Sequence, residues 1–212
     1  MADDTSPTIP MILTILARHF AKGRAENVRL LVLHTTENPC ANRVARSVAT
    51  WFAGASAPEA SAHYVVGPDE VVLCVPEEDT AWHAPPANPY SIGIEHTGRA
   101  AFTEADWATP EAKAMIDRSV ALVADLCVRH GIPAKLVDVV GLARGDAGIT
   151  THALVSSAFH KSTHTDPGKH FPIEDYLARV ALAVDALTDR FTKSSSGPST
   201  EEDATGAVTE PS

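Results

Sequence analysis

The sequence predicts a single α/β domain, in which helices flank a central mixed β-sheet, followed by a short C-terminal tail. The length of 212 residues allows one substantial buried core. Apolar runs typical of strands alternate with amphipathic helical segments through residue 192. From Lys193 the chain is rich in Ser, Thr, Gly, Pro and acidic residues and has almost nothing apolar to bury. We therefore expect a domain over residues 1–192 and a disordered tail or linker over residues 193–212.

The first expected elements are a central strand and a helix. The β-rich apolar run VRLLVLHTT (residues 28–36) predicts a strand inside the sheet. The segment ANRVARSVATWFAG (residues 41–54) predicts a helix, because its apolar residues recur at helical spacing and a glycine ends it. The same spacing predicts that Trp51 and Phe52 belong to the core rather than to a sugar-binding surface.

The following elements continue the alternation of strand and helix. The segment SAHYVVGPDEVVLCV (residues 61–75) predicts two strands joined by a Gly-Pro-Asp turn. Another short strand is expected in YSIGIEH (residues 90–96). Two long amphipathic helices are expected at residues 111–131 and 172–191, the first closed by a glycine and the second opened by a proline.

The composition excludes several classes of protein. The formal net charge is −10 and the basic residues do not cluster, which disfavours nucleic-acid binding. No apolar run approaches the roughly 18 to 20 residues of a membrane span. Aspartates precede the apolar patch at residues 9–16, so we do not expect export by a signal peptide. The widely spaced Cys40, Cys74 and Cys127 indicate reduced thiols rather than disulfides or a cysteine zinc site.

Three residues are candidates for a metal site. His34 ends the first predicted strand, where α/β sheets hold their ligands. His152 follows the segment GITT, and Asp166 lies fourteen positions later in STHTDPGKHFP. Two imidazoles and one carboxylate form one of the standard catalytic zinc shells, with a fourth position open for water. Each residue alone is more typical of a hydrogen-bonded structural role, so the combination carries the prediction.

Other interpretations remain open at this point. The HTD segment also fits half of an iron-binding facial triad, but only His170 follows it, too close to be the third ligand. A cysteine hydrolase is disfavoured because no cysteine lies in a nucleophile context. Glu95 could pair with Arg99 as a structural carboxylate. His63 is expected to be a structural hydrogen-bonding residue, and His170 either lines the site or closes the turn.

The chain resembles a known family through six motifs that occur in the family's order: LVLHTTE, SAHYVV, AWHA, SIGIEHTG, GITTHALVS and HTDPGKHFP. This family is the zinc-dependent N-acetylmuramoyl-L-alanine amidases of type 2, which include bacteriophage endolysins, cell-wall recycling amidases and animal peptidoglycan recognition proteins. The resemblance extends from about Arg18 to Tyr176 and is strongest to endolysins of phages that infect actinobacteria. It implies a fold like that of the peptidoglycan recognition proteins.

The resemblance implies roles for individual residues. His34, His152 and Asp166 match the family's three zinc ligands, and Glu95 matches the glutamate that many members use as general base. Glu95 would accept a proton from the attacking water and return it to the departing amine. Zinc would activate that water and polarise the carbonyl.

Two positions depart from the family's pattern. His164 stands where many members have a lysine that stabilises the developing oxyanion, so His164 is expected to take that role. An imidazolium loses its proton at lower pH than a lysine, so activity is expected to fall more steeply above neutral pH. Ala62 stands where some members have a catalytic tyrosine, which implies the variant that depends on the glutamate.

The function implied by the resemblance is hydrolysis of the amide bond between N-acetylmuramic acid and L-alanine in peptidoglycan. Trp82, His83 and Asn88, in the Pro-rich segment TAWHAPPANPY, are expected to line the substrate groove. The implied setting is a monomeric phage lysis enzyme that accumulates in the host cytoplasm and reaches the wall after release, with a separate wall-binding module beyond the tail. The alternative is a non-catalytic recognition module on the same fold, and the filled ligand positions favour catalysis.

Overall fold

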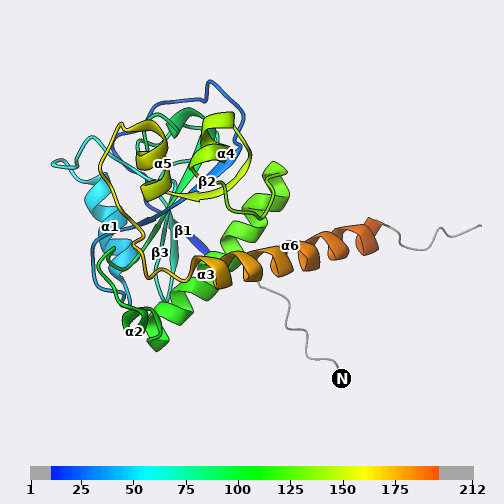
Figure 1. Ribbon diagram of the computed structural model, residues 1–212. Coiled ribbons are helices and arrows are strands. Elements are labelled where there is room, and N and C mark those ends of the chain that lie inside the picture. The colour runs from blue at the N-terminus through cyan, green and yellow to red at the C-terminus, as the bar shows by residue number, and fades with distance from the viewer. Residues whose placement is uncertain (1–10, 196–212) are drawn as a thin grey trace, which may run out of the picture.

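A six-stranded β-sheet organises residues 11–195, the part of the chain that the computed structural model describes (Figure 1). The strand order is β1-β4-β3-β5-β2-β6. The β3–β4 hairpin is antiparallel and every other neighbouring pair is parallel, so the sheet is mixed as predicted. The strands are β1 Ile12–Thr14, β2 Leu30–Thr35, β3 Tyr64–Val66, β4 Val71–Leu73, β5 Ser91–His96 and β6 Gly148–Thr151.

Helices lie on both faces of this sheet. The two long predicted helices are present, and one of them ends at Gly131 in the left-handed conformation that glycine adopts readily. The helices are α1 Val44–Ala53, α2 Glu104–Trp107, α3 Pro110–His130, α4 Val139–Arg144, α5 His152–Phe159 and α6 Ile173–Ser195, with a 3₁₀ turn η1 at Asn88–Tyr90. No helix among residues 11–195 is both long and apolar enough to cross a membrane.

The two faces of the sheet bury different clusters of side chains. On one face α3 and α6 pack over the central strands, whose Leu33 and Ile94 belong to the largest core cluster. On the other face α1 covers the hairpin through Phe52. Beside it, α4 and α5 pack against Val32 of β2 through residues such as Val155. The sheet is therefore covered on both sides, as parallel strands require.

The prediction that Trp51 belongs to the core is wrong, whereas Phe52 is buried as predicted. Trp51 is 55% exposed and Phe52 is 5% exposed. Helix α1 packs on the hairpin with the face that carries Ala45, Ala49 and Phe52, and Trp51 lies at the edge of that face. Helical spacing alone does not show where the covering structure stops.

Helix α6 continues past the predicted end of the domain. In Figure 1 its C-terminal half extends away from the sheet. The helix ends at Ser195, three residues beyond the predicted boundary at residue 192. Residues 196–212, the rest of the predicted tail, lie outside the described residues. So do residues 1–10, which include the start of the apolar patch and the aspartates before it. The domain boundary therefore remains a prediction.

Candidate active site

The C-terminal ends of three parallel strands bring the candidate residues together. Strand β2 lies between β5 and β6, and all three run in the same direction, so their C-terminal ends share one edge. His34 pairs in register with Glu95, and Leu33 pairs with Thr151. Because His152 directly follows Thr151, residues far apart in the sequence meet at this edge.

Side-chain alternation decides which of these residues face the site. Leu31 and Leu33 of β2 point into the core under α3 and α6, so His34 points to the opposite face. In β5, Ile94 points into the same core, so Glu95 shares the face of His34. The apolar alternation that builds the core therefore also orients the candidate ligand and the candidate base.

The N-terminus of α5 positions the other two ligand candidates. Thr151 caps this helix, since its Oγ1 accepts a hydrogen bond from the backbone N–H of Leu154 at 3.2 Å. His152 is the first helical residue, and the next backbone N–H, that of Ala153, donates to the carbonyl oxygen of Asp166 at 3.0 Å. The loop that carries Asp166 is thus hydrogen-bonded to the start of the helix that carries His152.

The Pro-Gly turn after Asp166 has a structural reason. Gly168 has φ +95°, a conformation that favours glycine. A Cβ at Gly168 would lie 2.0 Å from the carbonyl oxygen of Ala100. Only glycine therefore lets this loop turn and pack against the segment after β5.

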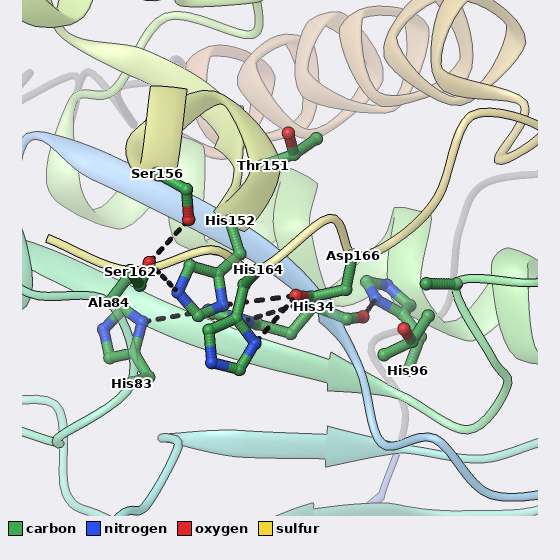
Figure 2. Close-up of polar contacts among 12 residues, drawn as sticks. His34, His83, Ala84, His96, Thr151, His152, Ser156, Ser162, His164 and Asp166 are labelled. Carbon is green, nitrogen blue, oxygen red and sulfur yellow. Dashed lines mark hydrogen bonds and ion pairs between the residues drawn. The ribbon is translucent and has the colours of Figure 1, made fainter. Parts of the chain in front are cut away.

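His34, His152 and Asp166 form a buried cluster in which both rings face one carboxylate. His34 Nδ1 lies 3.0 Å from Asp166 Oδ2, and His152 Nδ1 lies 3.3 Å from Asp166 Oδ1. The three potential ligand atoms all lie within 4.8 Å of one another. Figure 2 shows the imidazoles converging on Asp166 from two different elements.

The hydrogen bonds behind the rings test whether this cluster suits a cation. His34 Nε2 bonds His83 Nδ1 at 3.0 Å, and His152 Nε2 bonds Ser162 Oγ at 3.4 Å, so each ring turns Nδ1 towards Asp166. Burial lowers the pKa of His34 below its usual value. A neutral His34 with its proton on Nε2 points a lone pair at a carboxylate oxygen, which is unfavourable unless a positive charge lies between them. The two nitrogens and one carboxylate suit a divalent metal, and zinc in particular.

Glu95 is partly buried, and its carboxylate lacks full hydrogen bonding. Its Oε2 is buried and has no hydrogen-bond partner among the described residues. Burial, with added repulsion from Asp166 and Glu37, raises the pKa of Glu95 to about 8. A buried, poorly satisfied carboxylate beside a cavity is typical of a group that exchanges protons with a ligand.

His164 lies at the solvent side of the cluster. Its ring stacks on His152, with centroids 4.2 Å apart and an interplanar angle of 13°. Its Nδ1 lies 3.5 Å from Asp166 Oδ1, and its side chain is 62% exposed. Figure 2 shows it in front of the two buried imidazoles. This position exposes the ring to a bound substrate while the ring still contacts His152 and Asp166.

A cavity of about 470 Å³ opens over the cluster. The cluster, Glu95 and His164 line it together with Trp82 and His83, two of the three predicted groove residues. Trp51 and Phe52 line it as well, although the sequence placed both in the core only. No lysine or arginine is among the described residues that line this cavity.

Three further predicted positions lie away from the cavity lining. The Asn88 side-chain oxygen accepts hydrogen bonds from the backbone N–H groups of His83 and Ala84, at 3.1 and 2.7 Å, so Asn88 shapes the loop instead of contacting the cavity. His63 is buried, and its Nδ1 accepts from the N–H of Gly93 at 3.0 Å, in agreement with a structural role. His170 lies 3.6 Å from a Glu104 oxygen, outside the cavity.

Three residues near the site, Glu37, Ser162 and Ser91, were not predicted from the sequence. Glu37 lines the cavity with φ 57°, and its Oε1 accepts hydrogen bonds from the Thr35 hydroxyl and the Ala100 N–H at 2.9 and 2.8 Å. Ser162, behind His152, begins the STHTD segment, and its place beside two predicted site residues is a signal that could have identified it. Ser91 carries no such signal, because a small polar residue in a strand is ordinary.

Comparison with protein families gives a match to the model described as N-acetylmuramoyl-L-alanine amidase, over residues 24–169. Among curated proteins, N-acetylmuramoyl-L-alanine amidase A of Achromobacter lyticus is 31% identical over 154 residues. That alignment covers 69% of this chain and 79% of the relative.

Solved structures show the same fold at low identity. A crystal structure of the Staphylococcus aureus hydrolase AmiA in complex with its ligand matches with a TM-score of 0.66 at 16% identity, covering 88% of this chain and 87% of the other. A mutant endolysin from Bacillus subtilis matches with a TM-score of 0.53 at 18% identity, covering 82% and 99%. These likenesses confirm the predicted fold class.

Proposed function

This chain belongs to the N-acetylmuramoyl-L-alanine amidase family and hydrolyses the amide bond between N-acetylmuramic acid and L-alanine in peptidoglycan, and we propose that zinc held by His34, His152 and Asp166 serves this reaction. The observation that carries the proposal is the pair of Nδ1 atoms directed at one buried carboxylate, beside the cavity. Zinc at a site with three protein ligands activates a water nucleophile and polarises the carbonyl that is attacked.

In this proposal Glu95 moves the proton. Its Oε2 accepts a proton from the attacking water and later returns it to the amine of the departing L-alanine, so the leaving group departs as a neutral amine. The pKa of about 8 would leave much of this carboxyl protonated at neutral pH in the metal-free protein. A cation held by His34, His152 and Asp166 would lower that pKa by its charge, so that Glu95 would be ionised when it must act as a base.

His164 is the proposed donor to the oxyanion. Its exposed ring at the cavity wall can donate a hydrogen bond to the oxygen on which negative charge develops, a contact worth about 3 to 4 kcal/mol of barrier. We expect His164→Lys to retain activity and to extend it to higher pH, because lysine keeps its proton longer. Initial rates measured from pH 6 to pH 10 for both proteins test this, and an unchanged alkaline limb would reject the role.

The cavity suggests how the substrate lies. Trp82 and His83 keep their predicted role as groove residues, and we add Trp51, whose exposed indole offers a face to a sugar ring or an apolar part of the stem peptide. The absence of basic side chains among the described lining residues fits a neutral or cationic substrate segment rather than an anionic one.

The biological setting that we propose is phage lysis of an actinobacterial host. This proposal rests on the resemblance of the six sequence motifs to those of endolysins of such phages. In this setting the chain acts as a monomer, accumulates in the host cytoplasm and reaches the wall after a separate protein opens the membrane. A wall-binding module beyond the tail would supply the affinity for anionic wall polymers that a net charge of −10 does not offer.

The deciding experiment is mass spectrometry of purified actinobacterial peptidoglycan after incubation with the protein. The protein is used as isolated, after chelation, and after zinc, manganese or magnesium is restored, with Asp166→Asn as the matched control. Free stem peptides that begin at L-alanine, lost on chelation and recovered best with zinc, are the expected result.

Two other outcomes would change the conclusion. If manganese or magnesium restored activity and zinc did not, the amidase would stand and the identity of the metal would be wrong. If the sacculi bound the protein but no bond was cut in any sample, the alternative of a recognition module on this fold would replace the proposal.

A further inference from the structure

Behind His34, on the side away from Asp166, a hydrogen-bonded relay runs through His83 and Ser91 to the carbonyl oxygen of Ala87. The distances are 3.0 Å from His34 Nε2 to His83 Nδ1, 3.1 Å from His83 Nε2 to Ser91 Oγ, and 2.7 Å from Ser91 Oγ to the carbonyl oxygen. We infer that this relay holds the proton of His34 on Nε2 and so reserves Nδ1 for the metal. The inference rests on the proposed metal centre and makes Ser91 and His83 positioning residues for it.

The direction of each hydrogen bond follows from the Ala87 end. A carbonyl oxygen can only accept, so the Ser91 hydroxyl donates its one proton to Ala87. Ser91 Oγ then has only lone pairs to offer His83, so His83 carries its proton on Nε2. In a neutral His83 the other nitrogen, Nδ1, must accept, and the donor that faces it is His34 Nε2.

The same proton positions follow from the metal end. A neutral imidazole that coordinates a metal through Nδ1 has its proton on Nε2 and needs an acceptor there. His83 Nδ1 is that acceptor, and its own proton on Nε2 then needs an acceptor, which Ser91 supplies. Both directions give one consistent assignment from His34 Nε2 to the carbonyl oxygen of Ala87, in which every donor faces an acceptor. At the other edge of the His34 ring the Nδ1 lone pair faces Asp166 Oδ2, and a metal ion there would separate the two acceptors.

The glycine at position 93 leaves the space that the His83 ring needs to reach His34 and Ser91. A Cβ at Gly93 would lie 2.5 Å from His83 Cγ and 2.7 Å from His83 Nδ1, so the ring occupies the space of the missing side chain. The backbone of Gly93 does not have a positive φ, so the strand conformation does not require glycine there. The residue is a glycine in a strand because the imidazole lies against its Cα.

A second histidine offers a matched control. His96 Nδ1 donates to the backbone carbonyl of His34 at 2.9 Å, and its Nε2 bonds the Ser119 hydroxyl at 2.6 Å. Ser119 in turn bonds the hydroxyl of Tyr176 at 2.7 Å. This second series of hydrogen bonds, from His96 through Ser119 to Tyr176, is buried and also contacts His34. It bonds the backbone carbonyl of His34 and neither of its ring nitrogens.

The test compares the zinc affinities of variants that interrupt the His83–Ser91 relay or the His96–Ser119 hydrogen bonds. Each full-length protein is prepared metal-free and titrated with zinc in competition with a chromophoric chelator. We expect Ser91→Ala to raise the zinc dissociation constant by about tenfold, the lower end of the usual effect of removing a partner of a metal-bound histidine, because Ser91 acts on His34 through His83. We expect Ser119→Ala to leave that constant within about twofold of the wild type while lowering the melting temperature, because it removes a buried hydrogen bond far from the ring.

Further variants distinguish the loss of the hydrogen-bond acceptor at position 83 from a change in side-chain volume there. His83→Gln keeps an oxygen that can accept from His34 Nε2 and is expected to bind zinc more tightly than His83→Leu, which cannot accept. Gly93→Ala, which changes no hydrogen-bonding group, is expected to displace the His83 ring and to weaken zinc binding as His83→Leu does. If Ser91→Ala does not fold, Gly93→Ala and the His83 pair carry the test.

A direct measurement needs no variant. Long-range ¹H–¹⁵N correlation spectra of the metal-free wild type at pH 8 show which imidazole nitrogen carries the proton. Without a metal ion the Asp166 carboxylate favours a proton on Nδ1 of His34, and we expect the relay to outweigh it and to hold the proton on Nε2. A proton on Nδ1, or equal zinc affinities for Ser91→Ala and Ser119→Ala, would overturn the inference. If the wild type bound no zinc at all, the proposed metal centre would fail, and the spectrum would still decide where the proton lies.

Discussion

Glu77 and Glu95 are both partly buried, and the hydrogen bonding of their carboxylates is opposite. Glu77 receives hydrogen bonds from Arg129 at 2.7 and 2.8 Å, from His130 at 2.6 Å and from the Tyr64 hydroxyl. Burial disfavours its charge, but these donors outweigh burial and lower the pKa of Glu77 to about 2. Glu95 has a buried oxygen without a partner, and burial raises its pKa to about 8.

The difference separates a structural carboxylate from a functional one. Glu77 is satisfied by the protein itself, so it joins the end of α3 to the segment after β4 and needs nothing else. Glu95 is left unsatisfied at the edge of a cavity, where a ligand or a metal ion can change its charge. Leaving a buried carboxylate unpaired costs stability, and active sites commonly carry such a cost.

The largest expected effect is the loss of catalysis in Glu95→Gln. The amide cannot accept a proton from water, so the hydrolysis rate is expected to fall by about a hundredfold to ten-thousandfold. Zinc content is expected to remain near one per chain, since Glu95 is not among the proposed ligands. Release of stem peptides and metal analysis of the same preparation test both points, and full activity of the variant would remove Glu95 from the mechanism.

The second-largest expected effect is a loss of folding stability on substitution of Glu77. Glu77→Gln weakens the acceptor shared by Arg129, His130 and the Tyr64 hydroxyl and is expected to lower the free energy of unfolding by about 2 kcal/mol at pH 7. Activity per folded molecule is expected to be unchanged, because Glu77 does not line the cavity. Urea unfolding and activity at low temperature measure the two quantities, and a large loss of activity without loss of stability would contradict the comparison.

The pH dependence of stability is expected to have opposite sign at the two sites. The folded-state pKa of Glu77 lies below its unfolded value, so its contribution is complete above about pH 4.5 and is lost as pH falls towards 2. The folded-state pKa of Glu95 lies above its unfolded value, so the metal-free protein loses stability as pH rises from about 4.5 to about 8. Each contribution is on the order of 2 kcal/mol after allowance for solvent screening.

Unfolding free energies of the metal-free wild type and both Gln variants, measured between pH 3 and pH 9, resolve these two windows. The wild type minus Glu77→Gln difference should shrink at the acid end. The wild type minus Glu95→Gln difference should grow more unfavourable towards the alkaline end. Parallel curves for all three proteins would show that neither glutamate has a shifted pKa.

The smallest expected effect tests the outer part of the cavity. Trp51→Ala is expected to raise KM for polymeric peptidoglycan about three- to tenfold with little change in kcat, because an exposed indole binds substrate without touching the reacting bond. Stability should change little, and Phe191→Ala, another exposed aromatic far along α6, serves as the control. A fall in kcat with unchanged KM would place Trp51 in the chemistry instead.

Much of the fold could be predicted, because its signals are local. Apolar runs and helical spacing located β2, the β3–β4 hairpin, β5, α1, α3 and α6. Strands β1 and β6 and helices α2, α4 and α5 were missed because they are short and their polar and apolar residues show no clear period. The pairing of the sheet was also out of reach, since contacts between distant strands depend on the whole core.

The features of the candidate site also separate into those that local sequence predicts and those that only the packed fold determines. Strand-end position and motif order were enough to select His34, His152, Asp166 and Glu95, since a residue type at the end of a parallel strand already carries chemical meaning. The convergence of both Nδ1 atoms on one carboxylate, the relay through Ser91 and the exposure of Trp51 came only with the packed fold. Each depends on side chains from segments that are distant in sequence, and burial and hydrogen bonding between such segments are properties of the assembled core.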